Sequence, residues 1–185
     1  MTAAAKGCLA LLLGRRNAAS FFDFSQRGLV SSFIAFLFAT ALNAYLPLLL
    51  RLDIPPGSIT RGLVTSGLLL GLQIGFAALV LRQLGRLDGF TPYLIADNWA
   101  TFFFTLISLA LVVVGFPGDV ALFAIGIVVI VVEINIARLI VTLSPLQIAM
   151  FLIAQMVGLS IGLLLLAFFM PLPPEVTEAL SSAPQ

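Results

Sequence analysis

Few side chains in this sequence could do chemistry, and the most informative of them lies inside a long apolar segment. Residues 119–140 are almost entirely Ile, Val, Leu, Ala and Phe, yet they include Glu133, Asn135 and Arg138. A charge deep in a bilayer costs on the order of 2.5–3.5 kcal/mol, so Glu133 is expected to face other helices, to be paired or to be protonated. The pattern is typical of a proton site, a cation site or a substrate contact. It is equally typical of an internal ion pair or hydrogen bond that fixes helix register.

Other polar side chains also fall within apolar segments and are candidate members of an intramembrane polar site. They are Asn43, Gln73 and Gln155. The candidate partners for Glu133 are Arg82, Gln73, Gln147 and Asn135. Arg138 follows Glu133 by five residues, about 7.5 Å along a helix, and is expected to reach the head groups as an anchor.

The inventory for catalysis is thin. The sequence has no His and a single Cys, Cys8. A Ser–His–Asp triad, a histidine-ligated metal centre and an intramolecular disulfide are therefore excluded. The aspartates are scattered and no phosphate-binding loop is present. We expect no enzyme, no cofactor and no metal site, and the net charge of +1 gives no basic field for nucleic acid.

The elements that must position these residues follow from composition. The 185-residue chain is 61% hydrophobic and 9% charged, whereas soluble domains carry about 25% charged residues. We predict an all-α polytopic transmembrane bundle with five spans, because each apolar segment is about 20 residues long. The spans are expected at residues 28–50, 62–84, 92–114, 119–140 and 146–170. A four-span alternative would merge the third and fourth, but the turn residues Gly115-Phe116-Pro117-Gly118 argue against it.

Two spans carry recognisable start signals. Thr91-Pro92 and Ser144-Pro145 each resemble an N-cap followed by proline in the first helical turn. Tyr93 and Trp99 would then lie at the membrane interface as anchors. Asp97 would lie at head-group depth, where it could cap a helix or pair with Arg82 or Arg86.

Glycines recur every fourth residue in two spans, so they lie on one helix face. Small residues let helices approach closely in lipid. The two predicted packing faces are Gly67-Gly71-Gly75 in the second span and Gly158-Gly162 in the fifth.

The two ends of the chain lie outside the spans. In residues 1–27 a short apolar run precedes Arg15 and Arg16, whereas a signal peptide carries its basic residues before the run. We expect a cytoplasmic interfacial helix, with a floppy tail as the alternative. The side chains expected in lipid are Leu9, Leu12, Leu13, Phe21 and Phe22. Residues 171–185 are proline-rich and are expected to form a short external tail.

Basic residues indicate the orientation. Seven would lie on the N-terminal side of the membrane: Lys6, Arg15, Arg16, Arg27, Arg82, Arg86 and Arg138. Only Arg51 and Arg61 would lie on the other side. The positive-inside rule therefore predicts the N-terminus inside and the C-terminus outside.

Five closely spaced spans, a cytoplasmic N-terminal segment, short loops and a brief tail resemble the Yip-domain family of small membrane proteins, over residues 21–170. The polar signature of that family is not evident, since Phe22-Asp23-Phe24-Ser25 is only a distant counterpart. The resemblance implies a membrane helper or transporter without a named substrate, and it assigns no functional residue.

Two functions follow as hypotheses. The first is a non-enzymatic membrane protein that acts through helix–helix association, as a scaffold, assembly factor or accessory subunit. Its partners would be the lipid bilayer and either a second copy or a membrane complex, and no nucleic acid is expected as a partner. The alternative is a small transporter or channel subunit that uses Glu133 and the mid-membrane amides. The expected location is the bacterial inner membrane.

Overall fold

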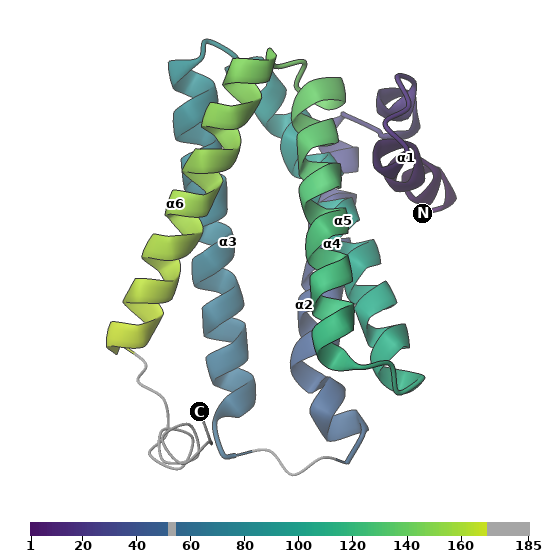
Figure 1. Cartoon of the computed structure of the whole chain (residues 1–185), viewed down its shortest axis with the longest axis vertical. Helices are drawn as coiled ribbons and strands as arrows, with labels where there is room; N and C mark the ends of the chain where they lie inside the picture. The colour runs from purple at the N-terminus through teal and green to yellow at the C-terminus, as the bar shows by residue number, and fades with distance from the viewer. Residues whose placement is uncertain (52–54, 170–185) are drawn as a thin grey trace.

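The structure, a computed structural model, describes residues 1–51 and 55–169, and that part of the chain consists of helices joined by short connections, with no strand (Figure 1). Five of the described helices are long and apolar enough to cross a membrane, which confirms the helical class expected from the sequence. They are α2 (Gln26–Leu49), α3 (Ser58–Gln83), α4 (Phe90–Val113), α5 (Gly118–Asn135) and α6 (Pro145–Phe169). A 3-10 turn, η2 (Leu87–Gly89), leads into α4, and α5 continues as a π-helical turn, η3 (Ile136–Ile140).

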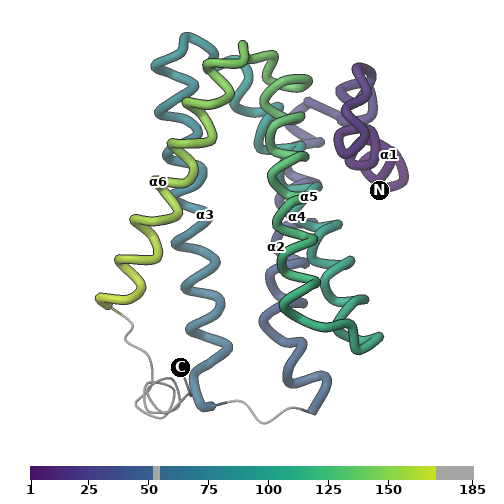
Figure 2. Tube along the Cα trace, viewed as in Figure 1, coloured from purple at the N-terminus to yellow at the C-terminus, as the bar shows by residue number. Residues whose placement is uncertain are grey.

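The turn between α4 and α5 separates two antiparallel helices. Gly115 has φ 71°, in the left-handed region that favours glycine, and its N–H donates to the Val112 carbonyl oxygen at 3.0 Å. The chain then reverses, as Figure 2 shows. The four-span alternative is therefore wrong.

The two predicted helix starts have different outcomes. Helix α6 begins at Pro145, and the Ser144 N–H donates to the Gln147 side-chain oxygen at 2.9 Å. Helix α4 begins at Phe90 with Gly89 as its N-cap, so the expectation of Thr91 as N-cap is wrong. The η2 turn already makes the backbone helical before Thr91. Pro92 is tolerated in the first turn because the first four N–H groups of a helix have no partner within it.

The long helices form two groups that converge at one end of the molecule and diverge toward the other (Figures 1 and 2). Helices α3 and α6 pack closely together, and α4 packs against α2 and α5. Both the α3–α4 and the η3–α6 connections lie at the convergent end, which we call the basic end because Arg82 and Arg86 lie there. The opposite end, where α2 finishes and α3 begins, we call the distal end.

Glycines allow α3 and α6 to approach closely. A Cβ added at Gly158 would lie 2.8 Å from the Phe76 ring, and one at Gly162 would lie 2.6 Å from a Leu69 methyl. Both distances are too short for a real side chain, so these glycines are required by the contact. The predicted face Gly158-Gly162 thus lies against α3.

The other glycine face has no neighbour among the described residues. A Cβ added at Gly67, Gly71 or Gly75 would meet no atom within 4 Å among the described residues. Gln73 lies on the opposite side of α3, and Leu69 and Phe76, which contact α6, lie far from the glycines around the helix. The expected packing contact therefore does not occur inside one copy of the protein.

The N-terminal segment packs on the α4/α5 group. Helix α1 (Thr2–Leu12) buries Leu11, and the side-chain amide of Asn135 donates to the Leu11 carbonyl oxygen at 2.8 Å. After the 3-10 turn η1 (Ala18–Phe21), Phe22 is also buried, so its expected place in lipid is wrong and Phe21 is only partly exposed. Exposed apolar side chains remain on this segment: Leu9, Leu12 and Leu13. The floppy-tail alternative does not describe α1, which is ordered against the bundle.

Candidate functional site

Two acidic side chains meet inside the bundle. Asp97 on α4 and Glu133 on α5 lie within hydrogen-bonding reach of each other. Asp97 is only 6% exposed, and Glu133 is partly buried. Two ionised carboxylates have no proton with which to bond, so a hydrogen bond between them requires a proton on at least one. The pair is therefore a place where the protein can hold a proton.

Amide side chains from the other helix group complete the site. The Gln73 amide on α3 donates to Asp97 Oδ2 at 3.2 Å and to the Tyr93 hydroxyl oxygen at 3.3 Å. The Gln155 amide on α6 donates to the same Tyr93 oxygen at 3.0 Å. We call Gln73, Tyr93, Asp97, Glu133 and Gln155 the polar cluster. It draws on α3, α4, α5 and α6 and joins the two helix groups.

Helix geometry places the two acids and the two amides of the cluster within about one helical turn of the same depth. Asp97 lies seven residues after the start of α4, and Glu133 lies seven residues before the end of η3. Because α4 and α5 are antiparallel, each carboxyl lies about 10 Å from the basic end at 1.5 Å per residue. Gln73 and Gln155 lie about 15 Å from the same end by the same measure. In helices that cross a hydrocarbon core about 30 Å thick, positions about 10–15 Å from the helix end lie inside that core.

Among the described residues, no basic side chain forms an ion pair with either acid. Asp97 accepts a hydrogen bond from Gln73 and lies within hydrogen-bonding reach of Glu133. Without a counter-ion, burial of the pair is least costly when its net charge is low. A proton or a small cation would lower that charge.

Unsatisfied polar atoms remain in and near the cluster. The Gln155 side-chain oxygen is buried and, among the described residues, has no hydrogen-bond partner. The Tyr93 oxygen already accepts from two amides, so its own O–H must donate elsewhere, and both carboxyl groups are close to it. Several acceptors therefore converge on the site, an arrangement that suits a proton or a hydrated cation.

The packing around Tyr93 corrects two expectations. Tyr93 is fully buried, with its ring edge-on to Phe151 at 5.1 Å between centroids. Trp99 is only 9% exposed and stacks beside Phe103 at 6.1 Å. Neither ring faces lipid, so their expected role as interface anchors is wrong. Both lie on the stretch of α4 that contacts its neighbours on several sides.

The expected ion pairs of the acids are also wrong. One of the two alternatives for Asp97 paired it with Arg82 or Arg86, but it accepts from Gln73 and lies within hydrogen-bonding reach of Glu133. Of the partners expected for Glu133, Gln147 instead binds the Ser144 N–H and Asn135 binds Leu11. Arg82 is exposed, and Gln73 reaches the site through Asp97.

The remaining candidate residues lie outside the polar cluster. Asn135 fastens α1 to α5, as described above, and Arg138 is exposed in the π-helical turn. Asn43 is exposed near the distal end of α2. The structure therefore brings Glu133, Gln73 and Gln155 together, and it does not bring Asn135, Arg138 or Asn43 to them.

Arg86 fastens the two connections at the basic end. Its guanidinium donates to the backbone oxygens of Val141 and Thr142 and to the Thr142 hydroxyl, the last at 2.6 Å. Thr142 has φ 60°, a left-handed conformation that is uncommon for a β-branched residue. Gly89 packs so closely on Val141 that an added Cβ would overlap a Val141 methyl. The basic end is therefore closed by direct contacts.

Sequence reasoning missed Asp97 and Tyr93 as members of the site. A usable signal was present, because an acid seven residues into one helix and an acid seven residues from the end of its antiparallel neighbour lie at equal depth. The four-residue spacing of Tyr93 and Asp97 also places both on one face of α4.

Comparisons with known proteins give no relative for this chain. No protein-family model, no curated protein and no solved structure matches it. The functional argument therefore rests on the site itself.

Proposed function

We propose that the protein is a proton-translocating unit of a membrane transport system, with the Asp97–Glu133 pair as its proton site. The observation that carries the proposal is the contact of these two carboxyl groups inside the bundle. An acid within a transmembrane segment is expensive and commonly marks an ion or proton pathway. Two acids in contact, flanked by amides rather than by cations, can take up and release a proton between them.

The position of the site supports the same function. Gln73 and Gln155 belong to the α3/α6 group, whereas Tyr93, Asp97 and Glu133 belong to α4 and α5. A change of charge on the acids therefore acts directly on the bonds that join the two groups. Transport proteins commonly place their coupling sites near mid-membrane between two such helix groups.

The arrangement in the membrane is part of this proposal. We place the N-terminus and the basic end in the cytoplasm and the C-terminus outside, because Lys and Arg concentrate at that end. Exposed Leu9, Leu12 and Leu13 next to Arg15 and Arg16 support an interfacial position for α1. A bacterial inner membrane and the likeness to the Yip-domain family remain predictions.

Voltage-driven proton flux tests the proposal. Purified protein in liposomes containing a pH-sensitive dye is given a potassium diffusion potential, and the internal pH is followed. We expect wild type to exceed empty liposomes, and Glu133→Gln and Asp97→Asn to fall to the level of empty liposomes. Asp88→Asn is the matched control, because Asp88 is exposed and lies outside the cluster. A Glu133→Gln flux equal to that of wild type would refute the role of the pair.

A second function is favoured by one specific observation, the absence of any described neighbour at Gly67, Gly71 and Gly75. We propose association with another transmembrane helix through this face, in keeping with a scaffold or accessory subunit. Mass measurement in native detergent micelles tests it. Gly71→Leu should shift an oligomer or complex toward the monomer. A wild-type protein that is itself monomeric and has no bound partner would argue against association.

A further inference from the structure

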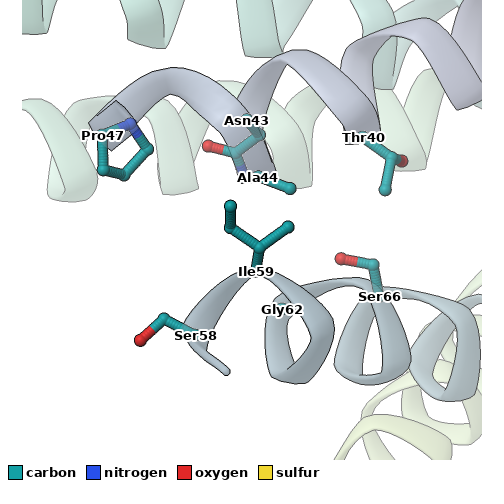
Figure 3. A pocket seen from close by; sticks show the side chains of 8 residues that line it. All are labelled: Thr40, Asn43, Ala44, Pro47, Ser58, Ile59, Gly62 and Ser66. Carbon is teal, nitrogen blue, oxygen red and sulfur yellow. The ribbon is translucent and has the colours of Figure 1, made fainter. Parts of the chain in front are cut away.

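A cavity at the distal end lies between α2 and α3. Its volume is about 210 Å³, and its lining includes the polar side chains of Thr40, Asn43, Ser58 and Ser66. Figure 3 shows Thr40 and Asn43 on α2 opposite Ile59 and Ser66 on α3, across the cavity. Apolar side chains, those of Ala44, Pro47 and Ile59, also line the cavity. A cavity of this size has room for several water molecules, which would bond to the polar side chains.

The cavity and the polar cluster share a face of α3. Gly62, Ser66 and Gln73 are spaced i, i+4 and i+11, so they lie in one line along the helix. Gly62 and Ser66 line the cavity, and Gln73 donates to Asp97. Ser66 and Gln73 are separated by about 10 Å along the axis. The upper part of the cavity is therefore two turns below the cluster.

Helix α4 presents a matching line of side chains. Thr101, Phe104 and Ser108 follow Asp97 at i+4, i+7 and i+11, so they lie on the same face of α4 as Asp97. Thr101 and Ser108 are partly buried, although the hydropathy of this helix is that of a membrane span. The Ser108 hydroxyl donates to the Phe104 carbonyl oxygen at 2.8 Å, so its oxygen can still accept. Phe104 is the apolar side chain in this line.

The two ends of the molecule differ in access. At the basic end, Arg86 joins the two connections and Tyr93 packs against Phe151, so contacts close the cluster on that side. At the distal end the helix groups diverge (Figure 1), and the cavity lies between α2 and α3. These observations favour the distal end as the side from which water reaches the cluster.

We propose that the cavity lined by Thr40, Asn43, Ser58 and Ser66 is the outer end of a hydrated path along which protons travel to Asp97 and Glu133. This inference deepens the proposed function and depends on it for the identity of the travelling ion. Waters in the path bond to Ser66, Thr101 and Ser108, and Phe104 narrows it. The path ends at the carboxyl pair, because the contacts at the basic end leave no opening on the other side of the pair.

Thiol accessibility tests the path without measuring transport. The background is Cys8→Ala, which removes the single native thiol. Burial raises the pKa of Cys8 to about 12, so even the native thiol is weakly reactive. Single cysteines are then introduced by Ser66→Cys, Thr101→Cys and Ser108→Cys. Intact vesicles are treated with a charged, membrane-impermeant methanethiosulfonate.

The matched control is Ile107→Cys. Ile107 neighbours Ser108 on the same helix turn but is 52% exposed on the outer surface, where lipid would cover it. We expect the three path cysteines to react roughly tenfold or more faster than this control, since a thiolate forms readily only where water reaches it. Reaction should occur from the distal side of the membrane. Equal rates for the path and control positions would overturn the inference.

The two proposals fail in distinguishable ways. If the path cysteines react but Glu133→Gln leaves proton flux unchanged, a hydrated path exists and proton translocation through the pair is refuted. If flux depends on Glu133 while the path cysteines remain as slow as Ile107→Cys, the proton site stands and this route to it is refuted. Phe104→Ala gives an independent measurement, because a wider path should raise the reaction rate of Thr101→Cys.

Discussion

Two contact regions of the molecule differ in kind. One is the interface between α3 and α6, and the other is the junction of these two helices with α4 and α5. At the first, glycines press against Phe76 and Leu69 with no space for another atom. At the second, Gln73 and Gln155 donate hydrogen bonds to Tyr93 and Asp97. Steric contact of the first kind fixes one geometry. Hydrogen bonds can exchange partners or admit water, so the second kind can respond to a proton.

We therefore expect the two contact regions to have different roles in the bundle. The α3/α6 pair is expected to behave as one unit, because its glycines pack closely against Phe76 and Leu69. Its junction with the rest of the molecule is where charge can act. The Arg86 contact holds the connections between the two groups at the basic end. Changes made at these three places should therefore have effects of different size and kind.

The largest effect on stability is expected from filling the α3/α6 contact. Gly158→Leu would force a side chain into the Phe76 ring and should cost about 3 kcal/mol, at the upper end of overpacking effects. Gly71→Leu is the matched control, since its Cβ has open space and should change the stability of the monomer by less than about 0.5 kcal/mol. Unfolding in mixed micelles measures both. Equal losses for the two variants would show that α3 and α6 are not held as described.

A smaller effect is expected from removing the amides at the junction. Interhelical hydrogen bonds in membranes contribute on average about 0.6 kcal/mol and at most about 1.7, so Gln73→Leu should cost roughly 1–2 kcal/mol. Gln155→Leu should cost less because it loses one bond. The double variant should be non-additive, because both amides bond to Tyr93. Gln147→Leu is the control, because the Gln147 side chain accepts from the Ser144 N–H outside the polar cluster. Strict additivity would mean that the two amides act independently.

The smallest of the three effects is expected at the basic end. Arg86→Lys replaces a planar group that reaches three acceptors with a single ammonium, and it should cost about 1 kcal/mol. Arg82→Lys is the control, because Arg82 is exposed one turn earlier. Hydrogen exchange at the η3–α6 connection gives a local readout. Faster exchange there in Arg86→Lys alone is expected, and unchanged exchange would show that the connection is held by other contacts.

Sequence reasoning reached the helices more easily than the site. Span positions follow from long apolar segments and from turn residues such as Gly115, which are local properties of the chain. The site depends on which helices are neighbours. From the sequence, candidate partners for Glu133 could be chosen only by their expected depth. The sequence could not show that α4 lies between α2 and α5, or that Asp97 on α4 faces Glu133.

Local patterns also suggested roles that tertiary structure changed. Tyr93 and Trp99 lie near the start of a span, where aromatic residues commonly anchor to the interface. In the folded chain both are enclosed by neighbouring helices. The two glycine patterns look alike in sequence, but Gly158-Gly162 lies against α3 and Gly67-Gly71-Gly75 faces outward. Only the arrangement of the helices distinguishes them.

The measurement that tests the central claim most directly is an infrared titration of wild type, Asp97→Asn and Glu133→Gln in lipid nanodiscs. If the two carboxyl groups share a proton inside the bundle, wild type at neutral pH shows the C=O band of a protonated carboxyl group. Either substitution then shifts or removes that band, whereas Asp88→Asn leaves it unchanged. Absence of the band in wild type, or an identical band in all the variants, would contradict the account.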